Sequence, residues 1–325
     1  MIITQTPLRI SFAGGGSDLL EFYGQHGGAV ISSAIDKYIY IIVKKRFDDL
    51  IVLNWSKKET VESVDQIEHE LIREVMRKTG VYKSVEITTI SDIPSEGSGL
   101  GSSSSVTVGL LQILYLYQGI IVDAERLARE ACEIEIDILG KPIGKQDQYI
   151  AAYGGLRHFE FKKDGTVTTN SPNIDSDFLY DLGLHMMLFF TGKTRKAEEI
   201  LSEQKRKIKD LEKLLKQMRD QSFELLKAFN KGDLTFLGQI LEEGWELKKQ
   251  LLGGISTPEI DKMYNLAKEA GALGGKITGA GGGGFLLIYV PLGKQDNVRN
   301  ALASYQELRF SLEQDGSKSI LNTRR

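Results

Sequence analysis

Apolar and polar positions in the first half of the chain alternate between strand-like and helix-like patterns. Residues 35–47 are β-branched and aromatic and residues 85–90 alternate, so both segments are predicted to be strands. Residues 106–117 are apolar almost throughout, which is typical of a buried helix. Residues 123–139 have helical periodicity and begin with Asp123, a candidate N-cap. The first half therefore mixes strands with helices that pack on them.

The second half is predicted to combine apolar strands with charged helices. Residues 193–231 are charged and carry irregularly spaced leucines and isoleucines, so surface helices with one buried face are favoured over a coiled coil. The order strand, helices, strand, strand, helix, strand is that of a ferredoxin-like α+β unit. We place a domain boundary near residue 180, which gives domains 1–180 and 181–325. The remaining predicted elements are strands at 154–161, 184–190, 276–278, 285–290 and 308–313, a helix between Pro258 and Gly271, and a helix near 294–305.

The composition is that of a globular protein and excludes several classes of partner. The 325 residues are 41% hydrophobic and 26% charged, and the formal net charge of −3 argues against a nucleic-acid partner. Apolar runs such as "MMLFF" are too short to span a bilayer, and the N-terminus shows no apolar signal region, so no membrane partner is expected. The single cysteine, Cys132, cannot form an internal disulfide, which favours a cytoplasmic protein. The oligomeric state stays open, with a homodimer as one option.

The stretch "GSGLGSSSS" at residues 97–105 lies between a predicted strand and a predicted helix, the arrangement that binds phosphate. Glycines let the backbone approach an anion, and the helix N-terminus presents unpaired N–H groups. It is not a Walker A loop, because no lysine follows Gly101, and its glycine spacing does not fit the dinucleotide fingerprint. A flexible linker or a simple capped helix start remains the alternative. The candidate phosphate ligands are Gly97, Ser98, Gly99, Leu100, Gly101, Ser102, Ser103, Ser104 and Ser105.

Two further stretches carry candidate ligand-binding residues. "PLRISFAGGGSD" at residues 7–18 follows a strand pattern with three glycines and Asp18, whose carboxylate can accept hydrogen bonds from sugar hydroxyls. The alternative role of Asp18 is the N-cap of the next helix. "GKQDQYIAAYGG" at residues 144–155 places Asp147 between two glutamines, with a surface carboxylate as the alternative. The candidate residues of the first stretch are Gly14, Gly15, Gly16, Ser17 and Asp18.

Together these stretches resemble the signature motifs of the GHMP small-molecule kinases, over essentially the whole chain. "PLRISFAGGGSD" is similar to the N-terminal motif, "PSEGSGLGSSSS" to the phosphate loop and "KITGAGGGGFLLI" (276–288) to the C-terminal glycine motif. The resemblance implies an α+β fold of two domains, one like domain 2 of ribosomal protein S5 and one ferredoxin-like, with ATP and Mg²⁺ as cofactors and a small-molecule acceptor.

Within the family, the chain most resembles the branch that phosphorylates the anomeric oxygen of D-glycero-D-manno-heptose 7-phosphate. The shared features are "GGGSD", four serines after "GLG", "GKQDQY" and "TGKTRKAEEIL" (191–201). Gly15 and Gly16 replace the Glu and His with which galactokinase holds its sugar, which argues against galactose. Ser104 stands where most members have alanine, a change that we expect to be harmless.

The resemblance also implies roles for single residues. Asp147 matches the family's catalytic base, and Arg9 matches a basic residue that can pair with it and offset charge near the γ-phosphate. Ser103 and Glu135 match the magnesium ligands. The alternatives are a surface arginine for Arg9 and an exposed helix carboxylate for Glu135. Further candidates on the substrate side are Gly281 and Gly282 and, for a phosphate on the sugar, Arg195, whose alternative is a basic surface cluster.

Other functions remain open beside a heptose-phosphate kinase. One is another sugar kinase of the same architecture, such as one for fucose. Another is a non-catalytic sensor of nucleotide and sugar, and a third is an unrelated nucleotide-binding scaffold. Retention of Ser103, Glu135 and Asp147 together argues against the sensor.

Overall fold

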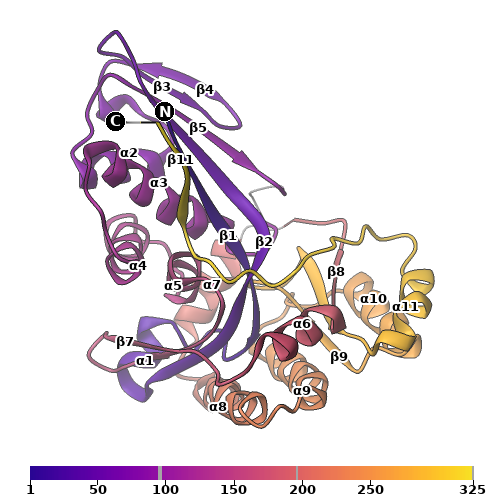
Figure 1. The fold of residues 1–325 in the computed structure, drawn as a ribbon. Coiled ribbons are helices and arrows are strands. Elements are labelled where there is room, and N and C mark those ends of the chain that lie inside the picture. Colours follow the sequence, from indigo (N-terminus) through magenta and orange to yellow (C-terminus); the bar gives the residue numbers. More distant parts are fainter. Residues whose placement is uncertain (94–96, 195–196, 324–325) are drawn as a thin grey trace.

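The computed structural model describes residues 1–93, 97–194 and 197–323, which form two sheet-based units (Figure 1). The first unit is built on an eight-stranded sheet and the second on a three-stranded sheet, both counted within the described residues. No helix in this part of the chain is long and apolar enough to cross a membrane.

The sheet of the first unit is organised around two long antiparallel strands, β1 and β2. Its order is β11-β1-β2-β5-β3-β4, and β6 pairs with the first part of β2 and with β7. Many of the buried side chains of β1 and β2 are isoleucine, leucine or valine, and their burial holds the two strands in register. The strands are β1 (Ile2–Ala13), β2 (Gly28–Lys45), β3 (Ile51–Asn54), β4 (Lys58–Val61), β5 (Val85–Ser91), β6 (Leu156–Phe161), β7 (Val167–Asn170) and β11 (Lys318–Asn322).

Helix α3 (Ser102–Gln118) packs on β1 and β2 and is the central helix of the first unit. A glycine with left-handed φ borders it at each end, Gly101 at 80° and Gly119 at 82°. The predicted N-cap at Asp123 is confirmed, because its carboxylate accepts from the Arg126 N–H at 2.8 Å. The other helices are α1 (Leu20–His26), η1 (Val64–Gln66), α2 (Glu70–Thr79), α4 (Ala124–Cys132), η2 (Glu133–Ile138) and α5 (Gln146–Tyr153).

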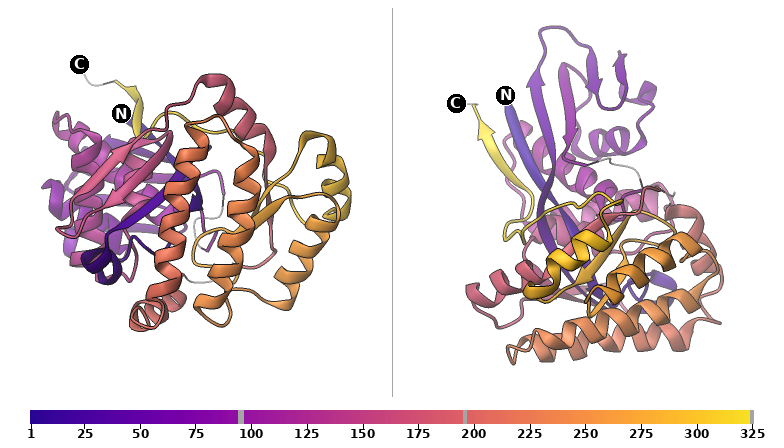
Figure 2. Two further views of the ribbon diagram at one scale, coloured as in Figure 1. Left: turned by 90° about the horizontal axis from the view of Figure 1, so that it is seen from below. Right: turned by 90° about the vertical axis from the view of Figure 1, so that its right-hand side faces the viewer.

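The second unit packs helices on an antiparallel sheet of order β8-β10-β9. Helices α8 and α9 lie side by side beneath the molecule (Figure 2), and both also contact β1 of the first unit. Side chains of both units therefore share one hydrophobic core. The elements are α6 (Ser176–His185), β8 (Met186–Phe190), α7 (Ala197–Arg206), α8 (Glu212–Phe229), α9 (Thr235–Leu251), α10 (Pro258–Glu269), β9 (Gly274–Ile277), β10 (Phe285–Tyr289), η3 (Leu292–Lys294) and α11 (Gln295–Ala301).

The predicted strand at 308–313 is wrong. This segment makes one isolated bridge, at Leu312, and Glu307 just before it makes another. The last strand of the described chain is β11, which lies beside β1 (Figure 1). The alternating side chains of Leu308, Phe310 and Leu312 pack against the core, so the pattern reflected burial without strand pairing. The predicted helix at 123–139 is also interrupted, because the π-helix η2 follows α4. The boundary at residue 180 stays a prediction, and the C-terminal segment returns to the first sheet.

Candidate active site

Arg9 and Asp147 form a bidentate ion pair between β1 and the first turn of α5. Arg9 Nε lies 2.8 Å from Asp147 Oδ1, and Arg9 Nη2 lies 2.7 Å from Asp147 Oδ2. Arg9 Nη1 also donates to the Gly99 carbonyl at 2.6 Å, so the guanidinium joins this carboxylate to the glycine-serine loop. The Arg9 side chain is 6% exposed and that of Asp147 is 27% exposed. The pair is therefore held rigidly, and its carboxylate remains open to a ligand.

The glycine-serine loop leads directly into the N-terminus of α3. Gly97, Gly99 and Gly101 have φ of 71°, 71° and 80°, a left-handed conformation that glycine adopts at little cost. The first turn of α3 contains four serines and no carboxylate, so its unpaired N–H groups face no competing negative charge of their own helix. A helix N-terminus of this kind attracts an anion such as phosphate.

Several side chains of this loop support its shape. Leu100 is fully buried, and its carbonyl accepts from the Arg9 N–H at 3.0 Å. The hydroxyls of Ser98 and Ser102 lie 3.1 Å apart, and Ser105 donates to a carbonyl of β1 at 2.8 Å. These four loop residues hold the backbone whose N–H groups would meet a ligand.

The glycine-serine loop contacts the C-terminal glycine loop directly. A Cβ on Gly99 would lie 2.7 Å from the Thr278 carbonyl oxygen, and one on Gly279 would lie 2.6 Å from Gly99 Cα. Thr278 Oγ1 donates to the Ser98 carbonyl at 3.2 Å. A Cβ on Gly284 would lie 2.6 Å from the same carbonyl oxygen. Gly99, Gly279 and Gly284 are thus required by contact between two loops of the protein.

Glu135 is fully buried and is held by three side-chain donors. Ser103 Oγ lies 2.8 Å from Oε1, Ser104 Oγ lies 2.8 Å from Oε2, and Gln148 Nε2 lies 2.5 Å from Oε2. Burial raises the pKa of Glu135, and the three hydrogen bonds oppose this shift. Glu135 lies in η2, and π-helical turns occur frequently at functional sites. The Ser104 hydroxyl, which an alanine at this position would lack, is one of these three donors, and the expectation that serine is harmless here stays a prediction.

Ser103 and Glu135 present oxygen donors that would suit a magnesium ion. Ser103 is exposed at the start of α3, and its hydroxyl adjoins one carboxylate oxygen, so two oxygen donors converge there. The described residues contain no cluster of three His, Cys, Asp or Glu side chains that could enclose a metal. Mg²⁺ commonly takes few protein ligands and completes its shell with water and substrate phosphates, so this sparse donor set suits it.

Asp18 ties the first glycine loop to the start of α5. Its carboxylate accepts from the Gly16 N–H and the Gln146 N–H, both at 3.1 Å. It is not the N-cap of α1, since that position is Leu19 and has no side-chain cap. Burial raises the pKa of Asp18, as does the charge of Asp147, while the two N–H groups lower it. The two predicted carboxylates therefore lie close enough to influence each other.

Some of the other residues of the first glycine loop hold its backbone in place, and others face open space or a neighbouring side chain. The Ser17 hydroxyl is fully buried and donates to the Gly14 carbonyl at 2.7 Å, and a Cβ on Gly14 would lie 2.0 Å from a β2 carbonyl oxygen. Gly15 faces open space. Gly16 faces Gln204 of α7, whose Nε2 is buried without a hydrogen-bond partner. Gln204 therefore lies beside a predicted site residue, and nothing in the sequence indicated this contact.

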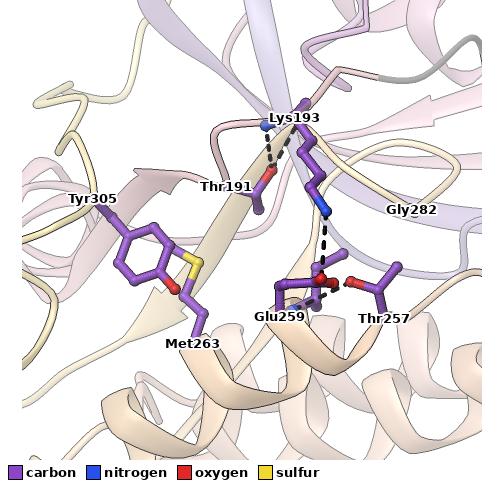
Figure 3. Close-up of a pocket in the computed structure, with 8 residues that line it drawn as sticks. Thr191, Lys193, Thr257, Glu259, Met263, Gly282 and Tyr305 are labelled. Atoms are coloured by element: carbon purple, nitrogen blue, oxygen red, sulfur yellow. Dashed lines mark hydrogen bonds and ion pairs between the residues drawn. The ribbon is translucent and has the colours of Figure 1, made fainter.

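A small cleft of the second unit contains one of the predicted substrate-side residues (Figure 3). Gly282 lines this cleft, and a Cβ on Gly281 would lie 2.9 Å from Ile255. Lys193 reaches across the cleft, and its Nζ lies 3.6 Å from Glu259 Oε1 in an exposed pair. Arg195, the candidate for the second phosphate, lies outside the described residues.

Two lysines at the junction of the units were not predicted as site residues. Lys248 of α9 donates to the carbonyls of Ile277 at 2.9 Å and Gly279 at 2.6 Å. Lys276 of β9 is 9% exposed and donates to the Phe12 carbonyl at 3.1 Å. Lys276 is the first residue of the C-terminal motif, whereas Lys248 lies in a charged helical stretch that gives no sign of a site.

Comparison with known proteins places this geometry among kinases. Residues 66–155 match the GHMP kinases N terminal domain, and residues 225–307 match the GHMP kinases C terminal domain. The chain is 32% identical over 338 residues to D-glycero-alpha-D-manno-heptose 7-phosphate kinase of Campylobacter jejuni, covering 98% of each chain. It is 28% identical over 242 residues to mevalonate kinase of Thermococcus onnurineus, covering 72% of this chain and 67% of that protein.

Among solved structures, a D-glycero-D-manno-heptose 1-phosphate kinase from Bacteroides thetaiotaomicron superposes with a TM-score of 0.81 at 28% identity, covering 100% of both chains. A galactokinase of Lactococcus lactis solved with galactose has a TM-score of 0.75 at 20% identity and covers 98% of this chain and 94% of that chain, which shows the shared fold. The expected fold class is confirmed by these matches.

Proposed function

Because the chain belongs to the GHMP kinase family, we propose that it is an ATP- and Mg²⁺-dependent kinase that phosphorylates the anomeric hydroxyl of D-glycero-D-manno-heptose 7-phosphate. The observation that carries this proposal is the Arg9–Asp147 pair, which joins an open carboxylate to a phosphate-type loop at the start of α3. The full-length similarity to a heptose 7-phosphate kinase supports the acceptor.

The glycine-serine loop would bind the nucleotide phosphates through backbone N–H groups at the start of α3. Each favourable charge contact at a helix end contributes about 0.3–1 kcal/mol at an exposed site, so several must act together. The loop shape depends on Gly97, Gly99 and Gly101 and on the buried Leu100 beneath them.

Ser103 and Glu135 would hold the magnesium ion, which offsets negative charge on the phosphates when bound. Ser104 and Gln148 fix the Glu135 carboxylate, so their hydrogen bonds orient a ligand that would otherwise rotate.

Asp147 would orient the acceptor hydroxyl and take its proton as the bond to phosphorus forms. General-base positioning of this kind contributes about 10²–10⁴-fold in rate. Arg9 fixes the orientation of the Asp147 carboxylate, and its charge lies near the loop where the γ-phosphate would arrive.

The first glycine loop would receive the sugar. Gly15 leaves open space there and Asp18 provides a carboxylate, although both Asp18 oxygens already accept backbone N–H groups. Without the Glu and His that the family's galactose enzymes carry at positions 15 and 16, this loop favours a sugar other than galactose.

The test is a coupled ADP assay with purified protein, Mg²⁺-ATP and a panel of acceptors. The panel contains heptose 7-phosphate, heptose 1-phosphate, free heptose, fucose, galactose and mevalonate, because two similar proteins carry names that differ in the position of the phosphate. We expect the highest kcat/KM with heptose 7-phosphate and a 1,7-bisphosphate product by ³¹P NMR. Turnover with fucose or heptose 1-phosphate in its place would reassign the acceptor, and ATP and sugar binding without turnover would favour the sensor.

A further inference from the structure

Two lysine ammonium groups lie between the two units, and neither forms an ion pair with a described residue. Lys248 reaches the C-terminal glycine loop from α9, and Lys276 reaches the end of β1 from β9. All the hydrogen bonds of these two ammonium groups within the described chain go to backbone carbonyl oxygens. Carbonyls orient an ammonium group without neutralising its charge.

The surroundings add positive charge. Burial and the charge of Arg9 lower the pKa of Lys248 to about 7. Burial, Lys248 and Arg9 lower the pKa of Lys276 well below its ordinary value. The nearby carboxylate of Asp147 is already shared in a bidentate pair with Arg9. Three basic side chains, Arg9, Lys248 and Lys276, therefore lie close enough to influence one another, and the described residues provide no carboxylate that pairs with either lysine.

Burial of an unpaired ammonium group is costly, and a bound anion would offset that cost by favouring the protonated form of both lysines. The position agrees with that conclusion. Lys248 holds the Gly279 carbonyl, and Gly279 packs on Gly99 of the glycine-serine loop. Lys276 holds the Phe12 carbonyl, two residues before the first glycine loop. The pair thus lies where both ligand-binding loops meet the second unit.

We propose that Lys248 and Lys276 together bind a phosphate group at the junction of the two units. The identity of that phosphate rests on the proposed function, which supplies two sources, the phosphate that the acceptor already carries and the γ-phosphate of ATP. A phosphate group on the acceptor would need a positively charged partner in addition to those that offset the charge of the nucleotide phosphates. Among the described residues of the cleft in Figure 3, Lys193 is already paired with Glu259.

The first experiment uses inorganic phosphate, so it does not depend on the acceptor. The melting temperature is measured against phosphate concentration at constant ionic strength for wild type, Lys248→Met and Lys276→Met. Lys249→Met is the matched control, because Lys249 is the next residue of α9 and its Nζ pairs with Glu246 at 2.7 Å. We expect wild type and the control to bind phosphate alike and the two test variants to bind it at least ten-fold more weakly.

Lys248→Gln serves if a methionine variant does not fold, since it keeps a donor for the carbonyls and removes the charge. The proposal is overturned if folded variants lacking the charge at position 248 gain the same stabilisation from phosphate as wild type.

The second experiment identifies the source of the phosphate. If Lys248→Met raises the KM for heptose 7-phosphate more than ten-fold, leaves that for ATP unchanged and removes the preference over free heptose, the lysines bind the acceptor's phosphate. If the KM for ATP rises and that for the acceptor does not, they bind the γ-phosphate. If wild type phosphorylates no sugar phosphate while its binding of inorganic phosphate still depends on the lysines, the proposed function fails and the lysine site stands.

Discussion

The two glycines at the ends of helix α3 allow a controlled test of whether the absence of a side chain at Gly101 preserves the geometry of the Arg9–Asp147 pair. Gly101 at its start has φ 80° and ψ 20°, and Gly119 at its end has φ 82° and ψ 16°. Alanine in this left-handed conformation costs about 1–2 kcal/mol, so both substitutions carry the same backbone strain. Their surroundings differ, because a Cβ on Gly119 meets nothing within 4 Å, whereas one on Gly101 lies 3.2 Å from Arg9 Cγ and 3.4 Å from Asp147 Oδ2.

The difference between the two variants therefore isolates the contact with the ion pair. Gly101→Ala must push the arginine stem and the carboxylate apart by a few tenths of an ångström. Since a misplacement of about 1 Å can cost ~10²-fold in rate, a shift of this size should lower kcat by about 3- to 10-fold. Gly119→Ala should keep the wild-type kcat, and both variants should lose similar stability.

The assay combines chemical denaturation with steady-state kinetics on the acceptor that wild type prefers. Free energies of unfolding establish that the strain is matched, and kcat then reports the geometry of the pair. Equal kcat values for the two variants at equal stability would refute the reasoning, because the Cβ at position 101 would then be accommodated without moving either partner.

Four further results are expected. Asp147→Asn should keep ATP binding and lower kcat by about 10²–10⁴-fold, and a kcat within a few-fold of wild type would remove the base role. Ser103→Ala and Glu135→Gln should each raise the Mg²⁺ concentration for half-maximal rate, and the double variant should be less than additive in an activity titration, since both side chains serve one ion. Ser104→Ala should lower the free energy of unfolding by about 1.5–3 kcal/mol, the range for a hydrogen bond to a charged group, and a neutral result in denaturation would mean that Glu135 is held without it. Burial and the neighbouring Arg9 guanidinium lower the pKa of Lys248 to about 7, so its ammonium group loses its proton as pH rises through that value. Wild type should therefore bind inorganic phosphate more weakly at pH 9 than at pH 7. Lys248→Met should not show this weakening.

Elements of the fold could be predicted from the sequence where the local side-chain pattern agrees with the pairing in the folded chain. The strand at β5 and the N-cap at Asp123 are such cases, because each is decided by neighbouring residues. The segment 308–313 is not, since its alternating apolar residues are buried on the core while its backbone pairs at isolated positions. Alternation reports which side of the chain is buried and says nothing of a partner strand. The π-helix at Glu133–Ile138 was likewise hidden, because its residues keep ordinary helical composition.

The candidate site was predictable to the extent that its residues lie in short motifs. Arg9 and Asp147 lie in two such motifs, and the structure joins them by two hydrogen bonds across 138 positions. Ser104 lies in a motif too, but its contact with Glu135 depends on where η2 packs against α3. Lys248 lies in no motif, and its sequence context is that of a solvated helix face. Lys248 stands out only in the folded structure, where its ammonium group has no carboxylate partner among the described residues.

The glycines of the two loops connect these observations. From the sequence, the glycines of the glycine-serine loop are expected to let the backbone approach a phosphate, and those of the C-terminal loop to border the same site. In the structure, Gly99 and Gly279 are crowded by each other, and Gly284 is crowded by the carbonyl of Ser98. Their small size is used to bring a loop of one unit against a loop of the other. The carbonyl of Gly279 then holds the Lys248 ammonium in place. A side chain at any of these glycines would therefore separate the glycine-serine loop from Lys248 and Lys276, so the proposed site depends on two glycine-rich stretches that lie far apart in the chain.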